Sequence, residues 1–372
     1  MSSRPVPWWQ PQVGPLEYGL LRDVLDSNFL NDGEFTTRFE IEVARLLGAK
    51  HAIGVTSGTS ALFLALAALG VGQGDEVVVP DVTFIATANA VTLTGATPVL
   101  VDIDPATLTM SPDALARAVT SRTRAVVPVH VSGRSADMGA IGAIARDHGL
   151  AIVEDAAEAL MSRRRGRMLG TIGAAGCLSF SPNKTITTGQ GGMVLTNDDA
   201  VYGRLCELKD QGRPVRGTGG DDMHPSVGFN FKLTNLQSAV GLGQLTYLAD
   251  RIARQKRTYL QYAAALSDLP GFRLPGFDVE DGEVPQWVDA IVERRDELDR
   301  FLAARDMHCR RFWFPLHTQK PYQRAEGAFP GSAWAARRAL WLPSAFTVSD
   351  ADISAVADAV REFAGAPEPI ES

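Results

Sequence analysis

The sequence predicts an α/β protein with a mainly parallel sheet and helices on both of its faces. Short apolar segments alternate with helical ones along the N-terminal half, a pattern typical of parallel strands joined by crossover helices. The 372 residues are 45% apolar and 21% charged, which is enough for one large domain and a smaller one. Strands are expected at 76–80, 98–102, 124–130, 150–155, 177–181 and 192–195, and helices at 61–69, 111–119 and 136–148.

The C-terminal part of the chain predicts a second, smaller α/β domain. A long helical pattern over 235–266 leads out of the large domain, and the expected domains are 1–245, which includes the N-terminal segment, and 246–372. Only the tail after Gly365 is expected to be disordered. The small domain is expected to hold strands near 286–292 and 309–312, a helix near 296–304 and a closing helix over 350–363.

The composition of the chain limits the classes of partner that are expected. A net charge of -7 and the lack of a tract rich in Lys and Arg argue against nucleic acid. The chain has no run of 18 apolar residues and no apolar signal run at its start, so a cytoplasmic location without a membrane partner is expected. Cys177, Cys206 and Cys309 are too widely spaced for a metal cluster and too few for a disulfide framework. Reduced thiols and no metal site are expected.

Lys184 is the strongest candidate for a chemical role. It stands between the apolar segment 177–181 and the glycine-rich turn 189–192. A lysine placed in this way can lose its proton and attack a carbonyl, which is how pyridoxal phosphate is held as a Schiff base. Most lysines are solvated surface charges, so the assignment depends on further features of the same kind of site.

Three such features accompany the lysine. Asp155 ends an apolar strand, where a carboxylate can keep a cofactor's ring nitrogen protonated, although it could instead cap the next helix. Ser57, Gly58 and Thr59 open an apolar helix, whose N-terminus favours a phosphate, although plain capping is commoner. Phe84 follows a strand and could stack on a planar ring, although a single aromatic is more often a core residue.

The order of these features resembles the DegT/DnrJ/EryC1/StrS family of pyridoxal-phosphate sugar aminotransferases. The resemblance covers about 25–360 and is closest to the branch of GDP-perosamine synthases. It implies the fold-type-I architecture, with a mainly parallel seven-stranded sheet in the large domain, a small C-terminal α/β domain, and pyridoxal 5'-phosphate as cofactor. The matching motifs are Glu154-Asp-Ala-Ala-Glu-Ala159, Asn183-Lys-Thr-Ile-Thr-Thr-Gly-Gln-Gly-Gly-Met193, Gly228-Phe-Asn-Phe-Lys-Leu-Thr-Asn235 and Arg310-Arg-Phe-Trp-Phe-Pro-Leu-His-Thr318.

The resemblance also implies catalytic and cofactor-binding roles. Lys184 would hold the cofactor covalently and then move a proton as acid and base, and Asp155 would pair with the ring nitrogen. Glu158 would approach the ring hydroxyl, at a place where most relatives carry Gln or His. The cofactor's ring face is assigned to Phe84. The phosphate is assigned to Ser57, Gly58, Thr59 and Ser179.

Asn230 resembles the family residue that reaches the phosphate of a neighbouring subunit, which implies a homodimer with shared active sites. Without the resemblance, Asn230 is better explained as a turn residue before a helix. His317 alone is more often a structural histidine, and only its place in the matching motif makes it a candidate. The candidates for binding a sugar nucleotide are His317, Arg310, Trp287 and Lys320.

The implied activity is transfer of an amino group from L-glutamate to a nucleotide-linked keto sugar, with GDP-4-keto-6-deoxymannose as first choice. UDP-linked or dTDP-linked keto sugars and cyclitol ketones stay open. A related sugar dehydratase carries His at the lysine position, so Lys184 disfavours it. A protein that binds the cofactor without turnover is disfavoured by Lys184, Asp155 and Ser179 together.

The chain also departs from the family pattern. Lys232 stands where relatives usually have Arg, Ser132 replaces a common Tyr, and Arg134 replaces a common Gln. A lysine is a point charge and lacks the planar two-pronged donor of arginine. Ser132 and Arg134 are expected near the mouth of the site, so the nucleotide pocket is expected to differ from that of relatives.

Overall fold

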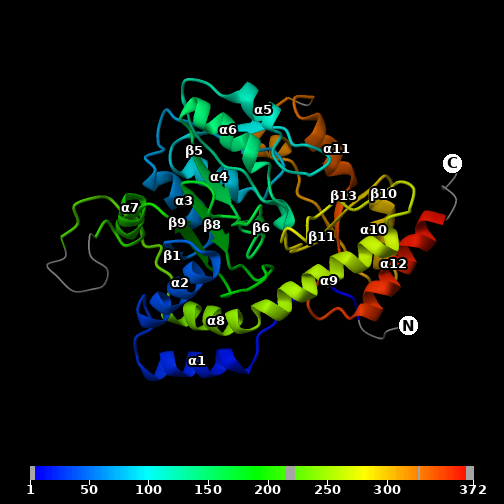
Figure 1. Cartoon of the computed structure of the whole chain (residues 1–372), viewed down its shortest axis with the longest axis horizontal. Coiled ribbons are helices and arrows are strands. Elements are labelled where there is room, and N and C mark those ends of the chain that lie inside the picture. The colour runs from blue at the N-terminus through cyan, green and yellow to red at the C-terminus, as the bar shows by residue number, and fades with distance from the viewer. Residues whose placement is uncertain (1–4, 214–222, 326, 366–372) are drawn as a thin grey trace.

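The computed structural model describes residues 5–213, 223–325 and 327–365. A large sheet with helices on both faces fills one side of the molecule, and a smaller sheet with its own helices lies beside it (Figure 1). The predicted α/β fold class is confirmed, since the large sheet has seven strands and most neighbouring pairs in it are parallel.

The large sheet brings several strand ends to one edge. Its order is β1-β9-β8-β5-β4-β2-β3, and only β9 runs against the other strands. The residues that follow β1, β2, β5 and β8 therefore meet at the carboxyl edge, where ligands bind in open α/β sheets. The strands are β1 (His51–Val55), β2 (Glu76–Pro80), β3 (Thr97–Val101), β4 (Thr123–Val126), β5 (Ala151–Asp155), β8 (Ala175–Ser179) and β9 (Gly192–Thr196).

The helix α3 (Gly58–Ala68) is the central helix of the large unit. It packs against β5, β8 and β9, and every residue from Ser60 to Leu66 is buried. An apolar helix surface on all sides is what a fully enclosed helix requires. The other helices of this part are α1 (Pro15–Asp26), α2 (Glu34–Leu47), α4 (Ala86–Leu93), α5 (Pro112–Ala118), α6 (Met138–His148) and α7 (Asp199–Lys209).

The predicted helical stretch over 235–266 is divided in two. The helix α8 (Asn235–Thr246) ends at Tyr247, and α9 (Leu248–Leu266) begins directly after it. α8 packs against α1 and α2, whereas α9 leads diagonally to the smaller sheet and packs against α12 (Asp350–Gly365) (Figure 1). Thr234 caps α8 by accepting a hydrogen bond from the backbone N–H of Gln237, which sets where the connection to the second unit starts.

The smaller sheet is antiparallel, with the order β10-β11-β13-β12. Its inner strand β13 was not predicted from the sequence. Val6, near the start of the chain, pairs with Met307 and packs in the core of this second unit. The domain division at residue 245 stays a prediction. The elements are β10 (Phe272–Arg273), β11 (Val288–Val292), β12 (Arg310–Arg311), β13 (Ala339–Leu342), α10 (Arg295–Ala303) and α11 (Pro330–Arg338). Short elements elsewhere are β6 (Arg163–Arg164), β7 (Arg167–Met168), η1 (Val131–Gly133), η2 (Leu316–Thr318) and η3 (Lys320–Tyr322).

Within the described residues, Cys177, Cys206 and Cys309 take part in no disulfide, and Cys177 is enclosed in the core of the large unit. Among the helices of the described ranges, none combines the length and the apolar character that crossing a bilayer requires. The tail 366–372, for which disorder was predicted, lies outside the described residues.

The central position of α3 predicts a large effect of truncating its core side chains. Leu64 has no exposed surface, whereas Leu260 on α9 is 52% exposed. We expect Leu64→Ala to lower the free energy of unfolding by about 2–5 kcal/mol, because it removes buried methyl groups and leaves a cavity. Leu260→Ala should change it by less than about 0.5 kcal/mol. Urea unfolding monitored by circular dichroism measures both, and equal effects would contradict the buried position of α3.

Candidate active site

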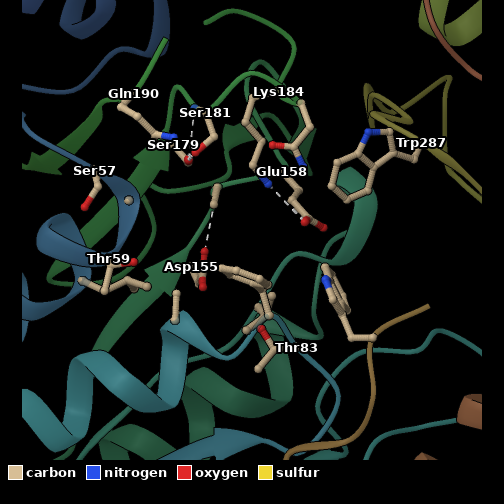
Figure 2. A pocket seen from close by; sticks show the side chains of 18 of the residues that line it. Ser57, Thr59, Thr83, Asp155, Glu158, Ser179, Ser181, Lys184, Gln190 and Trp287 are labelled. Atoms are coloured by element: carbon tan, nitrogen blue, oxygen red, sulfur yellow. Dashed lines mark hydrogen bonds and ion pairs between the residues drawn. The ribbon is translucent and has the colours of Figure 1, made fainter. Parts of the chain in front are cut away.

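A cavity of about 280 Å³ opens at the carboxyl edge of the large sheet. Its walls come from the residues that follow β1, β2, β5 and β8, and from the second unit (Figure 2). Most of the side chains proposed from the sequence meet in it, although they are far apart in the chain. The predicted residues that line the cavity are Ser57, Gly58, Thr59, Phe84, Asp155, Glu158, Ser179, Lys184, Trp287 and Arg310.

Lys184 reaches into the cavity from the connection between β8 and β9. Its Nζ lies 3.2 Å from Oε1 of Glu158 and 4.9 Å from the ring centroid of Trp287, and Figure 2 shows the lysine directed at both. The backbone N–H of Lys184 donates to the carbonyl of Ser181, so a tight turn sets the start of the side chain. The lysine is therefore held by an ion pair and by an indole face.

Glu158 is enclosed behind the lysine. Burial raises the pKa of Glu158, while the positive charge of Lys184 and the backbone N–H of Ser132 oppose this rise. That N–H donates to Oε2 of Glu158 at 2.8 Å, so the two carboxylate oxygens have different partners. Ser132 has a φ of 54°, in the left-handed region that is unfavourable for residues with a Cβ. The fold retains this conformation, which directs the amide at Glu158.

Ser132 also connects the cavity to the smaller sheet. Its Oγ donates to Oδ1 of Asp289 on β11 at 2.6 Å, and Nε1 of Trp341 donates to the same oxygen at 2.8 Å. Arg134 donates to Oδ2 of Asp289 at 2.8 Å. Ser132 and Arg134 were expected near the mouth of the site, but both are buried behind the cavity wall. They tie the two units together.

Asp155 lies at the end of β5 with its carboxylate buried. Oδ2 accepts a hydrogen bond from Thr87 at 2.8 Å, and Oδ1 accepts one from the backbone N–H of Ala157 at 3.2 Å. Burial raises the pKa of Asp155, although these two donors and the charge of Lys184 oppose the rise. No cation among residues 5–213, 223–325 and 327–365 forms an ion pair with it. A positively charged nitrogen placed in the cavity would therefore be stabilised there.

Glu154, the neighbour of Asp155, is a buried acid with a complete set of donors. Its carboxylate accepts from Nε2 of His130 at 2.9 Å, and Nδ1 of His130 accepts from the backbone N–H of Ala136, which makes Nε2 the protonated nitrogen. Burial raises the pKa of Glu154, but His130 and backbone N–H groups outweigh it and lower the pKa overall. The pairing of Glu154 with His130 was not predicted from the sequence. The backbone donors are Gly170, Ile172 and Gly173.

The N-terminus of α3 forms the opposite wall of the cavity. The side chain of Ser57 caps the helix by accepting from the backbone N–H of Ser60 at 3.1 Å, so the capping alternative is correct for this hydroxyl. The first amides of a helix have no partner within it, and those of Gly58 and Thr59 remain for an anion. A Cβ on Gly58 would lie 3.0 Å from Cβ of Ser179. A larger residue here would require Ser179 to shift by a few tenths of an ångström, so glycine suits this close approach.

The donor set fits pyridoxal phosphate. The buried carboxylate of Asp155 could pair with a protonated ring nitrogen, and the N-terminus of α3 together with Ser179 could bind a phosphate, while Lys184 enters the same cavity beside Glu158 (Figure 2). Phe84 lines the cavity although it is 54% exposed, so its ring is available for stacking on a planar group. The fit rests on the polarity and order of these groups.

Three predicted residues do not line the cavity. Asn230 is exposed and pairs with Asp210 in an isolated bridge, and Lys320 is exposed on η3. His317 is buried: its backbone N–H donates to Asp81, its Nδ1 lies 2.6 Å from Oδ2 of Asp81, and its ring stacks on Phe329. The structural role of His317 is thus evident, while the predicted contacts of all three with substrate or with a second subunit stay predictions.

Several lining residues were missed. Thr83 precedes the predicted Phe84, Gln190 lies in the glycine-rich turn, and Trp313 belongs to the motif that includes Arg310. Their positions beside predicted residues were the available signal. Ser181 and Asn183 stand on the same segment as Lys184 and also line the cavity.

Comparisons with known proteins agree with this geometry. The profile of the DegT/DnrJ/EryC1/StrS aminotransferase family matches residues 12–361. A GDP-perosamine synthase of Caulobacter vibrioides is 39% identical over 84% of this chain and 85% of its own. A GDP-perosamine synthase of Escherichia coli O157:H7 is 35% identical over 96% of this chain and 98% of its own. The solved structure of S. venezuelae DesV in complex with a ketimine intermediate matches with a TM-score of 0.90 and 37% identity, covering 95% of each chain.

The buried charge of Asp155 predicts a stability gain when it is removed. A raised folded-state pKa means that the stabilising contribution is present below the unfolded pKa and is lost as pH rises through the folded pKa. Asp155→Asn should therefore stabilise the cofactor-free protein at neutral pH by about 1 kcal/mol or more. Thermal unfolding between about pH 5 and pH 8 should show the gain shrinking as pH falls. A variant less stable than the wild type at neutral pH would contradict the burial argument.

Proposed function

The chain belongs to the DegT/DnrJ/EryC1/StrS aminotransferase family, and from this premise we propose that it aminates GDP-4-keto-6-deoxymannose with L-glutamate as donor. Membership makes the chain a sugar aminotransferase that depends on pyridoxal phosphate. The observation that carries the proposal is the cavity in which Lys184, the buried Asp155 and the N-terminus of α3 converge. The names of the two relatives support the GDP-linked substrate.

The cofactor would be held by groups that the cavity already presents. Asp155 would accept a hydrogen bond from the protonated ring nitrogen, and the first turn of α3 with Ser179 would bind the phosphate. Phe84 would cover one face of the ring. When bound, pyridoxal phosphate supplies a carbonyl that takes up the amino group and a ring that withdraws electrons from the reacting carbon.

Lys184 would serve as the acid and base. Among the described residues that line the cavity, Lys184 alone carries a side-chain amine. The Glu158 carboxylate, 3.2 Å from Nζ, stabilises the protonated form of this amine. Trp287 covers the same amine and limits the access of water to it. A base that holds its proton between a carboxylate and an indole can pass it to a substrate carbon within reach.

Glu158 supports the choice of substrate branch. Most of the family carries Gln or His at this place, and the perosamine-synthase branch carries Glu. A carboxylate here places a negative charge against the lysine and would approach the ring hydroxyl of the bound cofactor, as the resemblance implies. Its hydrogen bond from the Ser132 amide keeps it directed into the cavity.

The proposed substrate is tested by mass spectrometry of reactions that contain the holoenzyme, L-glutamate and GDP-, UDP- or dTDP-linked 4-keto-6-deoxy sugars. We expect an amino sugar from the GDP substrate, and a loss of about 10²-fold or more in rate for Lys184→Ala, since general acid–base catalysis contributes on this scale. Amination of only a UDP- or dTDP-linked sugar would reject the GDP substrate. Full activity of Lys184→Ala would reject the assigned role of the lysine.

We also propose a homodimer with shared sites. Asn230 is exposed, and Val227, three residues before it, is 82% exposed. Single apolar side chains are common on protein surfaces, so the proposal is carried by the exposed position of Asn230 and by the role that the resemblance implies for it. Asn230 would then reach the phosphate of the neighbouring subunit's cofactor, as the resemblance implies.

A complementation experiment tests the shared site. Lys184→Ala and Asn230→Ala each remove one component, and a mixed dimer combines one damaged site with one intact site if Asn230 acts on the neighbouring subunit. We expect mixing and re-association of the two weakened variants to raise activity above the average of the separate proteins. Unchanged activity in mixed dimers, verified by two affinity tags, would show that Asn230 does not act across an interface.

A further inference from the structure

Among the charged residues that line the cavity, Arg310 is the one for which the described part of the chain supplies no counter-ion. The charged residues that line the cavity are Asp155, Glu158, Lys184 and Arg310. Lys184 pairs with Glu158, and Asp155 is bound by neutral donors. Within the described ranges, the guanidinium of Arg310 forms no ion pair. An arginine that faces a cavity without a carboxylate partner is available to an anionic ligand.

Aromatic rings fix the position of this guanidinium. It lies 4.7 Å from the ring centroid of Trp8 and 5.7 Å from that of Trp341. Arg310 and Trp341 are register partners on β12 and β13, which explains why their side chains share a face. Stacking uses the faces of a guanidinium and leaves its N–H groups, which point outward in the plane, free to donate. Through Trp8, the N-terminal segment thereby supports Arg310, a residue of the cavity wall.

The neighbouring Arg311 shows the opposite arrangement on the same strand. Its Nε lies 3.2 Å from Asp299 and its guanidinium 3.4 Å from Asp296, both on α10. Alternation along a strand places successive side chains on opposite faces. Arg310 therefore faces the cavity while Arg311 is satisfied on the far side, which makes Arg311 a matched control.

The size of the cavity indicates which anion Arg310 meets. About 280 Å³ is below the range of roughly 300–1,000 Å³ that encloses small ligands. A nucleotide-linked sugar with its keto carbon near Lys184 must then extend out of the cavity, and its diphosphate must cross the mouth. Arg310 lines the cavity and is exposed, so it stands where the cavity meets solvent.

We propose that Arg310, stacked on Trp8, binds the diphosphate of the nucleotide-linked substrate. The proposal rests on the proposed function, because it takes the substrate to be a nucleotide-linked sugar. A guanidinium can donate two parallel hydrogen bonds to a phosphate, which lysine cannot do. Arg310 thus recognises the diphosphate, which the nucleotide sugar has and L-glutamate lacks. The carboxylates of glutamate are also negatively charged, so the two substrates must be tested separately.

Calorimetric titration of the holoenzyme with GDP, UDP and dTDP tests the assignment. For the nucleotide that binds the wild type best, we expect Arg310→Gln to raise Kd about 10- to 100-fold, Arg310→Lys to raise it less, and Arg311→Gln to leave it unchanged. The cofactor absorbance change on adding glutamate should keep its rate in Arg310→Gln. An unchanged Kd in Arg310→Gln, or a loss confined to the glutamate reaction, would overturn the proposal.

The same titrations separate this proposal from the proposed function. If none of the three nucleotides binds the wild type, the nucleotide-linked substrate itself is wrong, and the diphosphate assignment is rejected with it. Binding to the wild type that persists in Arg310→Gln rejects only the role of Arg310.

The contribution of the Trp8 ring to nucleotide binding can be tested separately. We expect Trp8→Phe, which keeps an aromatic face beneath the guanidinium, to bind the nucleotide within about threefold of the wild type, and Trp8→Leu to bind it more weakly. Thermal unfolding establishes that both variants are folded. Equal Kd values for the two variants and the wild type would remove Trp8 from the proposal.

Discussion

The burial of the Asp155 charge is the constraint on which the cavity depends. A buried carboxylate is costly unless donors or a cation surround it, and Asp155 has two neutral donors and no described cation in direct contact. Its neighbour Glu154 points to the other face of β5, where His130 and three backbone amides satisfy it. The hydrogen bonds of Glu154 fix the end of β5. The fixed strand end in turn holds Asp155, whose carboxylate has fewer partners, at the cavity. A ligand with a positive nitrogen supplies what the protein lacks there.

The position of the lysine also depends on a series of contacts that connects the two sheets. Lys184 is paired with Glu158, Glu158 accepts from the amide of Ser132, and the hydroxyl of Ser132 binds Asp289 on the smaller sheet. A displacement of β11 would therefore act on the carboxylate that faces the lysine. The left-handed backbone of Ser132 is retained because four separate groups use its polar atoms, and these contacts offset its conformational cost. The four groups are Glu158, Gln286, Asp289 and Trp341.

Local patterns were enough to predict where β2, β5 and β9 end to within one residue, and many of the lining residues. The strand predicted over 124–130 is shorter, since β4 ends at Val126. Asp155, Lys184 and the start of α3 are each marked by an apolar strand or a glycine-rich turn close by, so short-range sequence determines their place. The break at Tyr247 has no proline or glycine to mark it, and β13 follows α11 without a turn. The contact of Ser132 with Asp289 joins residues 157 positions apart. Such contacts arise from packing and have no local sign in the sequence.

Two of the departures from the family pattern that the resemblance implies, Ser132 and Arg134, meet Asp289 of the smaller sheet behind the cavity wall. The other two, Glu158 and Lys232, belong to the large unit, where Glu158 lines the cavity and Lys232 forms an ion pair with Asp210. Because a serine hydroxyl is far smaller than a tyrosine ring, the indole N–H of Trp341 and the Asp289 carboxylate can both reach it. Trp341 in turn lies beneath Arg310, so these substitutions act on the substrate side through packing. We infer that the chemistry depends on the large sheet, and that substrate selectivity depends on how the two sheets meet.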